Sequence, residues 1–98
     1  MLYIRLCFDK AGQLELRNRM REEHRAYLKP HAAQGAVPHM LQAGPLCVSD
    51  EDDTNIASFM ILEATDIEQA RRFHEGDPFT KAALYERVNI HRWDKHIG

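Results

Sequence analysis

The chain has 98 residues, a formal net charge of -2 with neutral histidines, and a sequence pI of about 6.3. A chain of this length folds as one domain, with a core small enough that a second copy would help to stabilise it. The charge lacks the basic excess of proteins that bind nucleic-acid phosphates or anionic membranes. No apolar stretch approaches the about 20 residues that cross a bilayer, and the amino terminus lacks a secretory pattern. We therefore expect a soluble cytoplasmic protein that binds neither nucleic acid nor membrane.

Cysteine and histidine usage limits the covalent and metal chemistry of the chain. Cys7 and Cys47 form no closely spaced pair, which indicates reduced thiols rather than a disulfide framework. No glycine-rich nucleotide-binding motif is present. The histidines lack the compact spacings of zinc sites; they are His24, His31, His39, His74, His91 and His96. The sequence therefore predicts no metal and no cofactor.

The first half of the chain predicts a strand, a long helix and a second strand. Strand alternation in residues 2–8 predicts one apolar face, made of Leu2, Ile4, Leu6 and Phe8. From residue 13 to 34 the apolar spacing becomes helical, with Pro30 expected to kink or shorten the last turn and Gly35 to end the helix. Residues 41–46 are a short strand candidate, in which Gly44-Pro45 would end pairing or form a bulge near a sheet edge.

The next segments predict a loop, a buried strand and a second helix. Residues 49–55 are polar and acidic and read as a loop. Residues 56–62 form an almost unbroken apolar run, which is typical of a strand covered on both faces. Thr65-Asp66-Ile67-Glu68 fits a capping box at the start of a helix that Gly76 would end.

A brief helix over 79–84 and a last strand through Val88 and Ile90 complete the predicted order of elements. The result is an α+β, ferredoxin-like βαββαβ domain with a short extra helix before the last strand, in which both main helices lie on one face of an antiparallel sheet. The apolar run at 56–62 suggests that the sheet of a second subunit covers the other face. We therefore expect a homodimer.

Two residues far apart in the sequence, His24 and Asp77, are candidates for acid/base chemistry. His24 interrupts an apolar helical stripe, where it either hydrogen-bonds inside the core or faces a site. Asp77 precedes Pro78 at a helix start, so N-capping alone would explain it. A carboxylate that accepts a hydrogen bond from one imidazole nitrogen would instead leave the other nitrogen free to exchange a proton with a substrate. The spacing leaves both interpretations open.

Other polar side chains carry weaker signals. Arg21 lies one turn before His24 and would attract an anionic substrate, or would belong to a solvated basic edge. Ser49 and Ser58 lie in no nucleophile elbow, so a serine nucleophile has little support.

Four short motifs span nearly the whole chain: Leu2-Tyr3-Ile4, Arg21-x-x-His24-x-x-Tyr27-Leu28, Ala43-Gly44-Pro45-Leu46 and Asp77-Pro78-Phe79. Their order and separation resemble the YciI-like (YCII-related) family and, more distantly, muconolactone isomerase and chloromuconolactone dehalogenase, which act on small carboxylated lactones. The resemblance implies a single domain over residues 1–98 that forms a dimeric α/β barrel, with the family's proposed histidine and aspartate at His24 and Asp77. The chain departs from the family at residues 53–58, where a glycine-containing turn is common, although Ser58 keeps the matching position.

With this resemblance we expect a small enzyme, similar to a lactone isomerase, dehalogenase or lyase, that acts on a small anionic organic substrate by proton transfer, elimination or lactone chemistry. His24 would be the acid/base and Asp77 would orient it. The substrate-binding residues would be Arg21, Gly44, Pro45, Ser58 and Phe79. Two alternatives use the same architecture: a noncatalytic ligand-binding or regulatory homodimer, and an oxygen-using monooxygenase.

Overall fold

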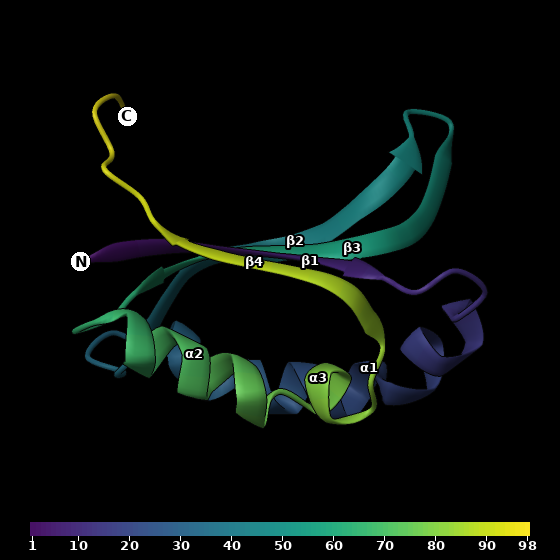
Figure 1. Cartoon of the computed structure of the whole chain (residues 1–98), viewed down its shortest axis with the longest axis horizontal. Coiled ribbons are helices and arrows are strands. Elements are labelled where there is room, and N and C mark those ends of the chain that lie inside the picture. Colours follow the sequence, from purple (N-terminus) through teal and green to yellow (C-terminus); the bar gives the residue numbers. More distant parts are fainter.

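The computed structural model describes residues 1–98 and contains one sheet with helices on one side. Its elements in chain order are β1 (Leu2–Asp9), α1 (Leu14–Leu28), the 3-10 helix η1 (Lys29–Ala32), β2 (His39–Ser49), β3 (Asp52–Glu63), α2 (Ile67–Gly76), α3 (Pro78–Lys81) and β4 (Tyr85–Arg92). The four strands are antiparallel in the order β2-β3-β1-β4, and the helices lie on one face of the sheet (Figure 1). This is the ferredoxin-like α+β fold that the sequence predicted, with the short helix before the last strand. No helix combines the length and the apolar character needed to cross a membrane.

The core lies between the sheet and the helices. Its buried apolar residues come from β1, α1, β3, the segment after β3, and α2; they are Tyr3, Leu28, Met60, Leu62, Ala64, Ala70 and Phe73. In β1 the buried positions are Tyr3, Arg5 and Cys7, whereas the alternating aliphatic side chains lie on the other face and are only half-buried. The alternation in the sequence identified the apolar face of β1 correctly. The helices, however, cover the opposite face, so the tyrosine, the arginine and the cysteine of that face form part of the core.

The first helix is shorter than predicted. α1 ends at Leu28 and η1 follows with Pro30 near its start, so the expected helix over 13–34 is wrong beyond residue 28. Pro30 has no backbone N–H to donate and its ring excludes the preceding turn of an α-helix, which accounts for the change. Gly35 has a positive φ of 87° and lies in the connection to β2 rather than at a helix end.

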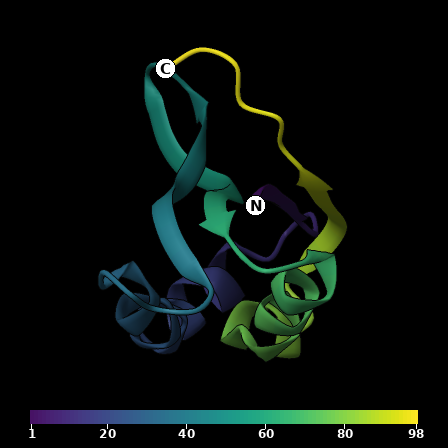
Figure 2. The ribbon, with the colours of Figure 1, turned by 90° about the vertical axis from the view of Figure 1, so that its left-hand side faces the viewer.

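The central hairpin is longer than predicted. β2 pairs with β3 through both Gly44 and Pro45, so this dipeptide neither ends the strand nor forms the bulge; the register shifts lie on either side of it. β2 is an edge strand, which tolerates a proline. The predicted loop over 49–55 is reduced to a turn at residues 50–51, because paired strand continues on both sides. The hairpin curves away from the helices, and the segment after β4 lies on the same side of the sheet (Figures 1 and 2).

The second helix starts with a reciprocal cap displaced by one residue from the predicted box. Asp66 Oδ1 accepts from the backbone N–H of Gln69 at 2.8 Å, and Gln69 Oε1 accepts from the N–H of Thr65 at 2.9 Å. The helix ends at Gly76, as predicted. A Cβ at Gly76 would collide with the hydroxyl of Tyr27, so this glycine lets the end of α2 approach α1 closely.

Candidate functional site

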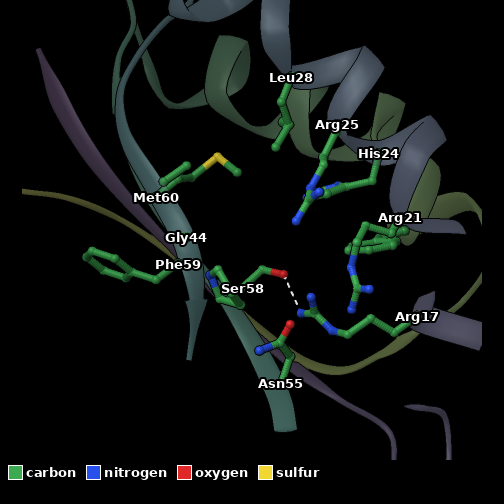
Figure 3. Close-up of a pocket in the computed structure, with 13 residues that line it drawn as sticks. Arg17, Arg21, His24, Arg25, Leu28, Gly44, Asn55, Ser58, Phe59 and Met60 are labelled. Carbon is green, nitrogen blue, oxygen red and sulfur yellow. Dashed lines mark hydrogen bonds between the residues drawn. The ribbon is translucent and has the colours of Figure 1, made fainter. Parts of the chain in front are cut away.

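A cavity of about 220 Å³ lies between α1, the β2–β3 hairpin and α3 (Figure 3). One wall is formed by α1, which brings three arginines and His24 to it, and the opposite wall by β2 and β3. The lining residues are Arg17, Arg21, His24, Arg25, Leu28, Ala43, Gly44, Pro45, Asn55, Ser58, Phe59, Met60 and Phe79. The cavity is therefore basic on one side, whereas the other side has no charged side chain.

His24 and Asp77 meet beside this cavity. His24 Nδ1 lies 2.6 Å from Asp77 Oδ1, and the Asp77 side chain has no exposed surface. The same oxygen accepts from the backbone N–H of Phe79 at 2.9 Å, so Asp77 also caps α3. Capping and histidine contact, which the sequence offered as alternatives, occur together. Because Asp77 lines no part of the cavity, it reaches a ligand only through His24.

The second oxygen of Asp77 belongs to an ion pair that the sequence analysis missed. Arg5 Nη2 lies 2.9 Å from Asp77 Oδ2, and both side chains are fully buried. Oδ2 accepts no well-aligned hydrogen bond, so the contact is mainly electrostatic. Burial opposes ionisation of Asp77, but the hydrogen bond from His24 and the charge of Arg5 outweigh it and hold the pKa of this carboxyl below its usual value.

Partners from β3, α2 and α3 surround the guanidinium of Arg5. Arg5 Nε donates to His74 Nδ1 at 2.8 Å, Nη2 donates to Thr80 Oγ1 at 3.3 Å, and Nη1 lies 3.7 Å from Met60 Sδ. Burial, helped by the nearby charge of Arg5, lowers the pKa of His74 to about 4. His74 is therefore neutral near pH 7 and accepts from the guanidinium, so Asp77 provides the negative charge that balances Arg5.

The contacts of the His24 ring fix its tautomer and its plane. Since Asp77 is ionised, its oxygen can only accept, so Nδ1 of His24 carries a hydrogen and Nε2 of the neutral ring carries a free electron pair. The ring stacks on Phe79 with centroids 3.8 Å apart and planes 9° from parallel. A ring held at one edge and on one face presents Nε2 in a single orientation, which is what a proton-transfer group requires.

The opposite wall carries a second polar cluster around Ser58. Arg17 donates through Nη2 to Ser58 Oγ at 2.6 Å and through Nε to Asp9 Oδ2 at 2.7 Å (Figure 3 shows the first contact). Tyr85 also donates to Ser58 Oγ, at 3.2 Å. The guanidinium of Arg17 lies over the ring of Phe79, 4.9 Å from its centroid. Phe79 thus packs against both the histidine and this arginine.

All the residues predicted to bind substrate line the cavity, namely Arg21, Gly44, Pro45, Ser58 and Phe79. The site also contains Arg5, Arg25 and Tyr85, for which the sequence predicted no role. Arg25 could have been found from the sequence, because it lies one turn after Arg21 on the same helix. Arg5 and Tyr85 gave no local signal, since their positions depend on long-range strand pairing. No group of three or more His, Cys, Asp or Glu side chains is arranged to hold a metal ion.

Comparisons with known proteins agree with this fold. Residues 1–94 match the YCII-related domain. Protein YciI of Escherichia coli O6:H1 (strain CFT073) is 33% identical over 99 residues, which cover 97% of this chain and 98% of that protein. Among solved structures, 5-chloro-2-hydroxyhydroquinone dehydrochlorinase (TftG) from Burkholderia phenoliruptrix AC1100, in complex with 2,5-dihydroxybenzoquinone, is 32% identical, with a TM-score of 0.83 and coverage of 98% of this chain and 96% of that one.

A more distant structure shares only the fold. PA3566 from Pseudomonas aeruginosa is 20% identical, with a TM-score of 0.54 and coverage of 98% of this chain and 93% of that one. The match to the domain spans all eight elements of the structure, from β1 to β4. The chain belongs to the YCII-related family.

Proposed function

We propose that this protein is a small-molecule enzyme in which Nε2 of His24 moves protons on a small, anionic, hydroxylated organic substrate. The observation that carries the proposal is the 2.6 Å contact between His24 Nδ1 and the buried Asp77 carboxylate, beside a cavity. A carboxylate in this position fixes the basic nitrogen toward the ligand and stabilises the imidazolium that forms during the reaction. Asp77 is a positioning residue in this scheme.

The size and charge of the cavity support a small anionic substrate. A volume of about 220 Å³ lies below the about 300 Å³ at which pockets for drug-sized ligands begin. Arg17 is already paired with Asp9, whereas Arg21 and Arg25 form no salt bridge; Arg21 Nη2 donates only to the neutral Asn18 Oδ1, at 2.7 Å. Two guanidinium groups without a carboxylate partner beside the cavity would attract a carboxylate, phenolate or enolate.

The similarity to the dehydrochlorinase supports elimination as the reaction class. In the scheme that we propose, Nε2 of His24 takes a hydroxyl proton from a halogenated polyhydroxybenzene and returns it to the ring carbon that bears the halogen, while the former C–O–H bond becomes a carbonyl. A second hydroxyl then loses its proton, its electron pair moves through the ring, and the carbon–halogen bond breaks. The sum is loss of one hydrogen halide and formation of a quinone, so no external oxidant is consumed.

A panel of halogenated hydroxyhydroquinones and small lactones tests this function. We expect turnover by the wild type and a loss of about 10²- to 10⁴-fold in kcat/KM for His24→Gln, the range for removal of a general acid/base. His39→Gln is the matched control, since His39 lies at the start of β2 outside the cavity. If His24→Gln keeps the wild-type rate while both variants are folded by circular dichroism, the assignment of His24 must be abandoned.

A second candidate is a noncatalytic, ligand-binding or regulatory homodimer. Arg21 and Arg25 favour it, because two arginines without a carboxylate partner would hold an anion without any proton transfer. This candidate predicts that the wild type binds 2,5-dihydroxybenzoquinone in calorimetry while no compound of the panel is consumed. If the protein is an enzyme, Asp77→Asn should lower the rate of turnover more than the affinity for the ligand.

We further propose that the protein is a cytoplasmic homodimer that forms a dimeric α/β barrel. The bare face of the sheet carries Ile4, Leu6 and Ile61, which the strand register sets side by side, and an apolar sheet face of this kind supports a cover by a second copy. The free thiols Cys7 and Cys47 support a reducing compartment. Ile61→Glu should give a monomer in sedimentation equilibrium, whereas the exposed Arg72→Glu on α2 should not. A monomeric wild type would refute the dimer.

A further inference from the structure

Ser58 occupies the wall of the cavity with both of its acceptor positions in use. It lies on β3 and lines the cavity, although only 6% of its surface is exposed. Its Oγ accepts from Arg17 Nη2 at 2.6 Å and from the Tyr85 hydroxyl at 3.2 Å. A serine hydroxyl has two acceptor positions and one hydrogen to donate. With both acceptor positions taken, Ser58 can only donate.

The surroundings keep Ser58 in this donor state. Arg17 is always protonated, and Asp9 holds it through two contacts, at 2.7 and 3.4 Å. Burial, only partly offset by the charge of Arg5, raises the pKa of Tyr85, so the phenol keeps its hydrogen near pH 7. A hydroxyl that accepts from a guanidinium is polarised and becomes a stronger donor. With the Tyr85 hydroxyl as the donor of its contact with Ser58, no side chain accepts the Ser58 hydrogen, and the cavity that Ser58 lines is the direction left for it (Figure 3).

We propose that Ser58 donates its hydroxyl hydrogen to a carbonyl or ionised oxygen of the ligand, on the wall opposite His24. The assignment rests on the proposed function and sharpens it. His24 would take the proton from one oxygen of the substrate, and Ser58, backed by the charge of Arg17, would stabilise the negative charge that develops on another. The absence of a basic partner at Ser58 makes it a donor and not a nucleophile.

The pairing of these two walls defines a class of ligand. A molecule that satisfies both has an acidic hydroxyl for His24 and a carbonyl or ionised oxygen for Ser58, attached to one small scaffold. Its ionised form suits Arg21 and Arg25 at the same cavity. Hydroxylated quinones and their hydroquinone forms meet these conditions, whereas a neutral molecule with a single oxygen does not.

Binding of 2,5-dihydroxybenzoquinone to Ser58→Ala, Ser58→Thr and wild type tests the assignment by calorimetry. We expect the alanine variant to bind about 10- to 100-fold more weakly, the range for a hydrogen bond to a charged group. The threonine variant, which keeps a hydroxyl, should bind within about threefold of the wild type, as should Ser49→Ala, whose exposed serine lies at the end of β2 outside the cavity. Thermal melts establish that each variant is folded.

Tyr85→Phe provides an independent measurement. Ser58 keeps its hydrogen in this variant, so affinity should fall less than in Ser58→Ala. Tighter binding by Tyr85→Phe would mean that Ser58 donates to the tyrosine in the wild type, which would overturn the assignment.

The outcomes separate the role of Ser58 from the proposed reaction. If wild type and Ser58→Ala bind and turn over alike while His24→Gln is inactive, the reaction stands and the assignment of Ser58 is wrong. If Ser58→Ala binds weakly but the wild type consumes no substrate of the panel, Ser58 is the predicted donor and the enzyme function is wrong. If the wild type neither binds the quinone nor turns over any compound of the panel, both are wrong.

Discussion

Replacement of Asp77 by asparagine is the sharpest test of the buried network. Asparagine has nearly the same shape but places one oxygen and one NH2 group where the carboxylate has two oxygens. If the amide oxygen faces His24 and the N–H of Phe79, the NH2 group faces Arg5 across the 2.9 Å contact. If the amide is reversed, its NH2 group faces the N–H of Phe79 and forces His24 Nδ1 to become an acceptor. Either orientation sets two donors against each other.

The expected losses follow from these contacts. Arg5 is left fully buried without its counter-charge, and removal of one partner of a buried pair costs about 3–5 kcal/mol. The Tm of a domain of this size should fall by about 10 °C or more. For activity, a carboxylate-to-amide change that disturbs the tautomer of a catalytic histidine lowers kcat by about 10⁴-fold.

Asp66→Asn provides the matched control. Asp66 is also an N-cap and accepts one backbone hydrogen bond at 2.8 Å, but it is exposed and touches neither an arginine nor a histidine. Asparagine is an equally good N-cap, so the free energy of unfolding of this variant should fall by less than about 0.5 kcal/mol. Urea unfolding at one fixed protein concentration measures the loss of stability in both variants. If Asp77→Asn loses no more stability than Asp66→Asn, Asp77 is only a cap and the argument for the network fails.

Two further predictions concern stability. His74 is neutral in the folded protein down to about pH 4, whereas in the unfolded chain it binds a proton near pH 6.5, so stability should fall as pH drops through this window. Allowing for its partial exposure, we expect a loss of up to about 2 kcal/mol in urea unfolding. The loss should be reduced in His74→Gln and retained in His96→Gln, and equal losses in both would contradict the argument. Separately, Gly76→Ala should cost about 1–3 kcal/mol through its collision with the Tyr27 hydroxyl. The cost should be smaller in a Tyr27→Phe background, whereas strict additivity in a double-mutant cycle would argue against the collision.

Local sequence patterns predicted the elements of the fold and the two central residues of the site. The helical stripe around His24 and the Asp77-Pro78 junction are signals within a few residues, and the structure has both features. The contact between these residues spans 53 positions, and no periodicity encodes it. The resemblance to a family supplied this pairing, and the roles of both residues remain predictions.

Arg5 shows why the rest of the site could not be predicted. An arginine that alternates with aliphatic residues in a strand is normally assigned to solvent, because a buried charge without a partner is costly. Its partners Asp77, His74 and Thr80 all lie around 70 residues further along the chain. The alternation in β1 identified two faces, but only the complete set of long-range partners decides which face the helices cover.

In β1 the more polar face is buried under the helices and the aliphatic face is not, and this arrangement affects the core, the site and the proposed dimer. Because the helix-covered face carries Tyr3, Arg5 and Cys7, the aliphatic groups of the strand remain on the bare face. A chain under selection only for monomer stability would bury the aliphatic face under its own helices and leave the arginine in water. The interior of the monomer instead contains the charged network around Asp77, which contacts His24, and the aliphatic groups lie on the bare face, where the proposed second copy would cover them. The candidate site and the proposed dimer therefore use opposite faces of one strand. Replacement of Arg5 by an apolar residue should disturb Asp77 without weakening the proposed association of subunits.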